Sequence, residues 1–147
     1  VLRIEPPLDE MPLYIRGNAI IPMGPDMAFV GEKPFNPVTL DIWLTSEAEF
    51  DLFDDDERAH TEERVHLRAV RRGDEISLDV GASAKTFVVK FNKTRQPKRV
   101  SLNGKSIPRL GSQGDFDKAE LGWHFNPGSI VYVKFEGRGT SNTVRIG

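Results

Sequence analysis

The sequence predicts an all-β fold: an antiparallel β-sandwich without long helices. Short runs rich in Val, Ile, Phe and Leu recur every eight to twelve residues or so, a spacing typical of sandwich strands. The 13 Gly and 10 Pro residues stand mostly between these runs, where they mark turns. Asn103-Gly104, between two such runs, predicts a two-residue hairpin turn, because a type I′ turn needs positive φ at both positions.

In the first part of the chain the apolar runs predict four short strands and one long loop. The loop covers residues 24–37, where three prolines remove backbone donors and fix φ. We expect a hairpin between the third and fourth strands, with a turn at residues 45–49. The four strands are expected at residues 13–15, 18–21, 38–44 and 50–53.

The rest of the chain predicts seven more strands. Residues 64–70 and 75–80 flank Gly73-Asp74, and Val65 and Leu67 alternate there with polar side chains, a pattern typical of a half-buried hairpin. No periodic segment predicts a helix longer than about two turns. Further strands are expected at residues 86–91, 98–102, 121–125, 130–135 and 143–146.

Charge is distributed unevenly along the chain. Residues 1–60 carry 4 basic and 13 acidic side chains, whereas residues 61–147 carry 16 basic and 9 acidic ones, which gives a net charge of −2. A shift of this size predicts two small β modules, 1–60 and 61–147, whose opposite charges favour association. Chance segregation of surface charge is the alternative explanation.

Composition also excludes several functional classes. The net charge of −2 argues against a nucleic-acid partner, and no apolar run is long enough to span a membrane. Cys is absent, which removes disulfides, thiolate ligands and a cysteine nucleophile. No glycine-rich phosphate loop follows a strand, so no cofactor is expected. We expect a soluble chain and favour a cytoplasmic location.

The run Asp54-Asp55-Asp56-Glu57 is the densest acidic feature. Clustered carboxylates suit hard cations, but an EF-hand loop would need Gly and Glu where Ala59 and Val65 stand. A cation site of another kind and a solvated acidic turn both remain open. Because glycosidase carboxylates need environments that separate their pKa values, this exposed run is not assigned a catalytic role, and no metal ligand is assigned.

Three side chains are candidates for carbohydrate contact. Trp43, Trp123 and His124 fall on expected strands, and aromatic rings that are exposed there can stack on sugar faces. A ring on a short strand more often packs in the core, so both interpretations stand for these residues. The tripeptide Asn92-Lys93-Thr94 fits an N-glycosylation acceptor.

Three blocks, in order, resemble a known family. Residues 7–22 read PLDEMPLYIRGNAIIP, residues 31–40 GEKPFNPVTL and residues 50–56 FDLFDDD. These blocks are similar to the segment that follows the catalytic barrel in glycoside hydrolase family 31, the α-glucosidases and α-xylosidases. From Thr61 on, the similarity is one of pattern, as in the stretches 86–89, 97–105 and 122–125.

The resemblance implies a partial proximal C-terminal sandwich at residues 1–60 and a distal C-terminal sandwich at 61–147. It implies hydrolysis of α-glucosides or α-xylosides by a barrel partner whose catalytic aspartates have no counterpart here, so no catalytic residue is expected. Val1 is not an initiator Met, and a fragment of a longer enzyme is expected. Its role would be structural support or homo-oligomerisation. The alternative is an autonomous carbohydrate-binding sandwich.

Overall fold

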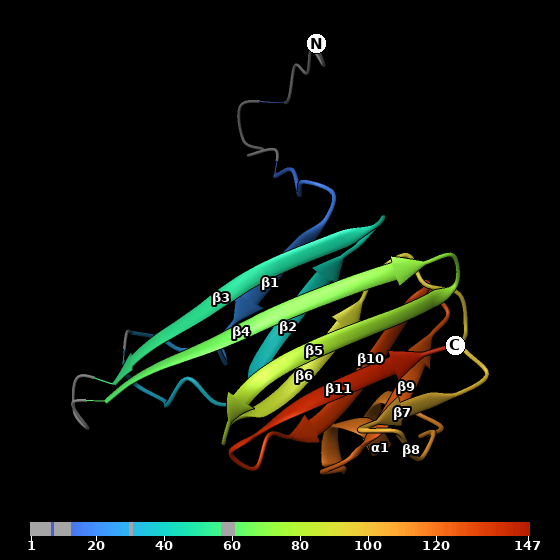
Figure 1. Cartoon of the computed structure of the whole chain (residues 1–147). Helices are drawn as coiled ribbons and strands as arrows, with labels where there is room; N and C mark the ends of the chain where they lie inside the picture. The colour runs from blue at the N-terminus through green and yellow to red at the C-terminus, as the bar shows by residue number, and fades with distance from the viewer. Residues whose placement is uncertain (1–6, 8–12, 30, 57–60) are drawn as a thin grey trace.

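The computed structural model describes residues 7, 13–29, 31–56 and 61–147, without the side chains of 55, 56 and 61. Within this part of the chain, two β-sheets pack face to face (Figure 1). The predicted all-β sandwich is therefore confirmed. The described residues include one helix, α1 (Gln113–Lys118), and no helix among them has the length and apolar character to cross a membrane.

Sheet A has five strands. Its strands pair antiparallel except β2 and β6, which are parallel. A parallel pair needs a long crossover, and here the intervening chain builds three strands of the other sheet. The spatial order of sheet A is β1 (Ala19–Met23), β2 (Val38–Trp43), β6 (Thr86–Phe91), β10 (Ile130–Glu136) and β9 (Gly122–Asn126).

Sheet B has six strands, and all its pairs are antiparallel. Two of its hairpins turn where the sequence predicts, at Gly73 and at Asn103-Gly104, and the backbone has positive φ at all three residues. The spatial order of sheet B is β3 (Glu47–Asp56), β4 (Thr61–Arg72), β5 (Glu75–Ser83), β11 (Thr140–Ile146), β7 (Val100–Leu102) and β8 (Lys105–Ser106).

One hydrophobic core lies between the sheets. Alternate residues of each strand point into it, because successive side chains of a strand face opposite sides of the sheet. Phe87 and Phe135 are direct cross-strand partners, fully buried, with ring centroids 5.6 Å apart. Burial of each such ring contributes about 1.5–3 kcal/mol. The other largest buried side chains are Phe91, Leu40, Ile42, Leu67, Leu78, Val38, Val65, Val80, Val89 and Val100.

The predicted boundary between residues 60 and 61 lies at the tip of the β3–β4 hairpin, where residues 57–60 are outside the described residues. Strands from both sides of that tip share both sheets and the core. The change in charge is thus a property of the surface of one sandwich. The assignment of the two segments to the family's proximal and distal domains stays a prediction.

The expected hairpin between residues 38–44 and 50–53 is wrong. The first of these strands, β2, belongs to sheet A, and the second, β3, belongs to sheet B. The connection crosses the sandwich because the buried Leu44 and Ala48 both reach the core. The side-chain oxygen of Asn18 holds this turn, since it accepts hydrogen bonds from the backbone N–H groups of Thr45 and Ser46 at 2.8 and 2.9 Å.

The strand expected at residues 13–15 is also wrong. Those residues form no ladder, and Leu13 and Tyr14 are 82% and 64% exposed. Asn18 adopts a φ of +60°, which breaks the extended backbone before β1 begins. The segment therefore leaves the sandwich (Figure 1). The loop expected at 24–37 is confirmed for its described residues.

Candidate functional site

Trp123, the first carbohydrate candidate, is a core residue. It lies in β9, and only 4% of it is exposed. Its backbone N–H donates to the Pro108 carbonyl at 3.0 Å and its carbonyl accepts from Leu110 N–H at 2.8 Å. The guanidinium of Arg109 lies over the ring, 5.4 Å from the centroid. The indole therefore presents no open face on which a sugar could stack.

His124 is half-buried on the other side of the same strand. Its Nδ1 lies 3.2 Å from the Leu110 carbonyl oxygen, and its cross-strand partner is Tyr132 of β10. The tyrosine ring in turn packs against Phe116 of α1 at a centroid distance of 5.9 Å. The imidazole thus belongs to the packing of β9, β10 and the segment before α1.

Trp43 is half-buried on the outer face of sheet A, far from the other two candidates. Three strand steps separate β2 from β9, which corresponds to about 14 Å at the usual spacing between strands. Its Nε1–H donates to Asp41 at 3.1 Å, and Lys93 Nζ lies 5.6 Å from its ring centroid. The structure therefore does not bring Trp43, Trp123 and His124 together into one platform.

A buried polar cluster surrounds Asp41, and the sequence did not predict it. Asp41 is 7% exposed and Asn92 is 5% exposed. The Asn92 side-chain N–H donates to Asp41 Oδ1 at 2.6 Å and to the Ile42 carbonyl at 3.1 Å, and Lys90 Nζ lies 3.3 Å from Asp41 Oδ1. The asparagine of the predicted glycosylation tripeptide is thus an internal donor in the folded chain.

We expect Asn92→Asp to destabilise the fold by about 3 kcal/mol at neutral pH. The change replaces the donor with a second carboxylate beside Asp41 and leaves the Ile42 carbonyl without its side-chain partner. Urea unfolding monitored by tryptophan fluorescence would measure the loss.

The double variant Asp41→Asn/Asn92→Asp is the matched control. It restores one amide and one carboxylate to the cluster and should recover part of the lost stability. If the single and double variants were equally unstable, charge repulsion at this site would not be the cause.

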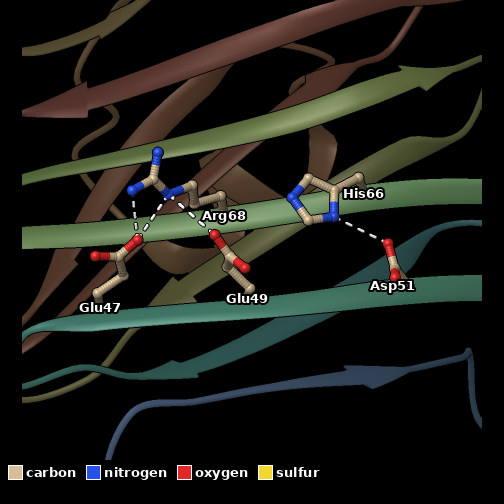
Figure 2. Close-up of polar contacts among 5 residues, drawn as sticks. All are labelled: Glu47, Glu49, Asp51, His66 and Arg68. Atoms are coloured by element: carbon tan, nitrogen blue, oxygen red, sulfur yellow. Dashed lines mark hydrogen bonds and ion pairs between the residues drawn. The ribbon is translucent and has the colours of Figure 1, made fainter.

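A charged strip runs along the outer face of the β3–β4 hairpin: Glu47, Glu49, Asp51, His66 and Arg68 (Figure 2). The acidic residues come from β3 and the other two from β4. The Arg68 guanidinium donates from Nε to Glu47 at 2.7 Å and lies 3.2 Å from Glu49. His66 Nδ1 lies 2.9 Å from Asp51 Oδ1.

The register of the hairpin produces this strip. Glu49 is directly opposite Arg68, and Asp51 is directly opposite His66, so alternate side chains of opposite charge meet on one face. The sequence contains the signal, because acidic residues alternate along 47–51 while basic ones and histidine alternate along 64–68. The predicted hairpin pairs residues 50–53 with 38–44, whereas the structure pairs β3 with β4, so this strip was not predicted from the sequence.

The carboxyl of Asp51 accepts from two side chains of β4, and these contacts lower its pKa. A hydrogen bond from Arg64 Nη2 at 2.7 Å, and a second from His66, hold its pKa below the ordinary value. A lowered pKa keeps the group ionised, which is the opposite of what a glycosidic general acid needs. The strip therefore joins two strands by exposed ion pairs, each of modest effect.

We expect the Asp51 carboxyl to titrate below an ordinary aspartate, and Arg64→Gln to raise its pKa toward the ordinary value. Because the folded pKa is depressed, the associated stabilisation is present above the unfolded pKa and is lost as the pH falls through the folded pKa. Carbon-13 NMR titration of the Asp51 side-chain carboxyl would measure its pKa in the parent chain and in the Arg64→Gln variant.

Arg138→Gln is the control for this titration, since Arg138 pairs with Glu136 in another part of the fold. It should leave the titration of Asp51 unchanged. An equal shift in both variants would show that the long-range charge of the chain, and not the contact with Arg64, sets this pKa.

The acidic turn falls partly outside the described residues. Within them, Asp54 Oδ2 pairs with Lys85 Nζ at 2.5 Å, and the same amine lies 3.5 Å from Glu63. The part of the chain that the structure describes contains no group of three or more His, Asp or Glu side chains placed to hold a metal ion. The cation site suggested for this turn stays a prediction.

A shallow groove of about 760 Å³ lies on the outer face of sheet B. Four arginines from three segments line it, and three carboxylates lie among them, so its charge is mixed and favours no anionic ligand. Its charged lining residues are Glu47, Arg68, Arg72, Glu75, Asp79, Arg99 and Arg145.

Comparison with known proteins identifies the architecture. No family model matches the chain. Among solved structures, a family 31 glycoside hydrolase dextranase of Flavobacterium johnsoniae, complexed with glucose, matches 90% of this chain with a TM-score of 0.76 and 22% identity. The cycloalternan-forming enzyme of Listeria monocytogenes, in complex with a pentasaccharide substrate, matches 90% with a TM-score of 0.78 and 17% identity.

The chain has the fold of one part of these enzymes. It spans 19% of the dextranase chain and 13% of the cycloalternan-forming enzyme. The resemblance to family 31 glycoside hydrolases, first seen in three sequence blocks, is thus confirmed at the level of the fold. The matched sandwich is a small share of each of these chains.

Proposed function

We propose that this chain is a non-catalytic β-domain of a family 31 α-glycosidase, and that it supports a catalytic domain in the same polypeptide. The proposal rests on how much of each chain the structural match covers. The match includes 90% of this chain but only 13–19% of the enzymes that share its fold. A sandwich used in this way contributes stability and position, while substrate binding and catalysis take place elsewhere.

The surface chemistry of the chain supports a structural role. Asp51 and Asp54 of β3 are paired with basic side chains, Asp51 with Arg64 of β4 and Asp54 with Lys85 of the β5–β6 turn. Such carboxylates are engaged in ion pairs within the sandwich, which supports a structural role rather than a catalytic one. The burial of Trp123 weakens the alternative of an autonomous carbohydrate-binding module.

The substrate class that we propose is α-glucosides, with α-xylosides as the alternative. The dextranase that shares the fold is complexed with glucose, which favours the first. Discrimination between the two sugars would depend on the catalytic domain, where a single missing hydroxymethyl group must be sensed.

An antibody raised against this chain tests the proposal in the source organism. We expect it to detect a polypeptide several times longer than 147 residues, and to precipitate an activity that hydrolyses p-nitrophenyl α-glucoside. A polypeptide no longer than this chain would overturn the proposal. A long polypeptide that hydrolyses only the α-xyloside would overturn the preferred substrate class.

A further inference from the structure

The turn at Asn103-Gly104 holds the one Asn-Gly pair of the chain, and such a pair is chemically reactive. The backbone nitrogen of the glycine can attack the asparagine Cγ, so that a five-membered succinimide forms and ammonia leaves. Water then opens the ring to aspartate or isoaspartate. Asparagine is among the thermolabile residues of proteins, and glycine hinders the attack least because it has no side chain.

The surroundings of this turn leave room and water for the reaction. Asn103 and Gly104 are both exposed, and a Cβ at Gly104 would meet no atom within 4 Å. The turn joins two short strands, β7 and β8, and β8 is the edge of sheet B (Figure 1). Sequence, exposure and position at an edge therefore all favour deamidation of Asn103.

The side chain of Asn103 is nevertheless bonded to β11 through both of its polar atoms. Its Nδ2–H donates to Asn142 Oδ1 at 2.9 Å, and its Oδ1 accepts from the Thr143 N–H at 2.8 Å. We name these two hydrogen bonds the Asn103–β11 bridge. Ring closure requires the side chain to rotate so that Cγ reaches the Gly104 nitrogen, and this rotation breaks the bridge.

The bridge is anchored in a buried side chain. Asn142 is 5% exposed, and its Nδ2 donates to the Gly137 and Thr140 carbonyls at 3.0 and 2.8 Å. A flipped amide would place the Asn142 oxygen against these two carbonyl oxygens, so this oxygen stays directed at Asn103. The orientation of the Asn103 amide is therefore set by the interior of the fold, although the turn itself is exposed.

Neither product of the reaction fits the bridge. An aspartate at position 103 has no N–H for Asn142 Oδ1, so two acceptors would stand where the structure has a hydrogen bond. A buried acceptor that loses its donor is destabilising. An isoaspartate lengthens the backbone of a two-residue turn, and the length of the turn fixes the register of a hairpin. Deamidation would therefore loosen this end of sheet B irreversibly.

We propose that Asn103 is a deamidation site whose reaction is suppressed in the folded chain by the Asn103–β11 bridge. The reaction proceeds from a locally open form, and the free energy of local opening sets the population of that form. Since two hydrogen bonds must break, roughly a tenth of the molecules or fewer are open. The inference does not depend on the proposed function, and its failure would leave that function untouched.

Peptide mapping by mass spectrometry tests this proposal. The polypeptide that contains this chain, folded or unfolded in guanidinium chloride, would be incubated beside a synthetic peptide of residues 98–107 under the same mildly alkaline conditions. Trypsin then releases residues 100–105 from all three samples, because it cleaves after Arg99 and Lys105. Conversion of the Asn103 amide to a carboxyl raises the mass of this fragment.

We expect Asn103 of the folded polypeptide to react roughly tenfold or more slowly than Asn103 of the synthetic peptide. The unfolded polypeptide should react at the rate of the peptide. Equal rates in the folded polypeptide and the peptide would overturn the proposal. A polypeptide that stays slow when unfolded would also overturn it, because the fold would then not be the cause.

Thermal unfolding of two variants gives an independent readout of the bridge. Asn103→Asp removes the donor to Asn142 and should lower Tm by about 4 °C or more. Asn126→Asp is the matched control, because Asn126 Oδ1 accepts from the Gly128 N–H at 2.8 Å and a carboxylate keeps that role. Equal Tm values for the two variants would show that the Asn103–β11 bridge does not hold the turn.

Discussion

Replacing Trp123 with Ala is expected to lower the stability of the fold by about 3–5 kcal/mol, the usual cost of truncating a buried tryptophan. The indole is 4% exposed and belongs to the single core between the sheets. The change would also remove the ring over which Arg109 lies. For a chain of this size each kcal/mol shifts Tm by roughly 4 °C, so thermal unfolding followed by circular dichroism would show a large shift.

Trp43→Ala is the matched control, because it removes the same side chain from the half-buried outer face of sheet A. It loses the Nε1–H hydrogen bond to Asp41 and should cost about 1–2 kcal/mol. If Trp123→Ala left Tm unchanged and abolished binding of an oligosaccharide, Trp123 would be a sugar platform and the core assignment would be wrong. A large loss of stability at Trp123 places the ring in the core.

The positions of strands such as β6 and β10 were predictable because each of them satisfies a local rule. In β6 and β10, alternate residues such as Val89 and Val133 are fully buried while their neighbours are half-buried, and a period of two is visible in the sequence itself. The turn at Asn103-Gly104 was equally local, since its two positive φ values belong to adjacent residues that tolerate them.

The pairing of β2 was not predictable by the same means. Adjacent strands in the sequence usually pair, and the sequence between β2 and β3 resembles an ordinary hairpin turn. What directs β3 into the other sheet is long-range: the Asn18 side chain, 27 residues earlier, accepts from Thr45 N–H, and the Arg71 N–H donates to the Ser46 carbonyl at 2.6 Å. No local pattern contains that information.

Helix α1 was not predicted, although the sequence contains a local signal for its start. Ser112 caps it, accepting a hydrogen bond from Asp115 N–H at 3.1 Å, and this Ser-x-x-Asp spacing is a recognised signal for a helix start. The helix has only six residues, too few for an apolar period to appear. Its single buried side chain, Phe116, is fixed by tertiary packing.

The candidate site shows the same division between local and long-range information. The sequence shows which aromatic residues fall on strands. It does not show whether each side chain lies on the core side or the solvent side of its sheet, and this decides its exposure. Trp123 faces the core and His124, its neighbour, does not. The Asp41–Asn92 contact joins residues 51 apart, so the sequence suggested a glycosylation acceptor where the fold uses an internal hydrogen-bond donor.

Gly137→Ala is expected to destabilise the fold by about 2–4 kcal/mol, through overpacking and loss of hydrogen bonds. A Cβ at this position would lie 2.2 Å from the Ser83 carbonyl oxygen and 3.1 Å from that of Lys85. Both neighbours are backbone atoms, which cannot rotate away as a flexible side chain could. The backbone at Gly137 and the backbone at Ser83 and Lys85 must therefore move apart.

The contacts that such a separation would break are specific. The Gly137 N–H donates to the Lys85 carbonyl at 2.9 Å, and the Gly139 N–H donates to that of Ser83, also at 2.9 Å. The buried Asn142 donates from its side chain to the Gly137 carbonyl at 3.0 Å. The β5–β6 turn and the β10–β11 turn are joined through these hydrogen bonds, so both sheets would lose support at this end of the sandwich.

Gly17→Ala is the control, because a Cβ there would meet no atom within 4 Å. Its Tm should stay within about 2 °C of the parent chain, as expected for a surface substitution within ±0.5 kcal/mol, while Gly137→Ala should lower Tm by roughly 8–16 °C. Equal Tm values for the two variants would mean that the close approach between Gly137 and Ser83 does not exist in solution. A selective loss at Gly137 establishes that the two turns are packed backbone against backbone, where a single methyl group cannot be accommodated.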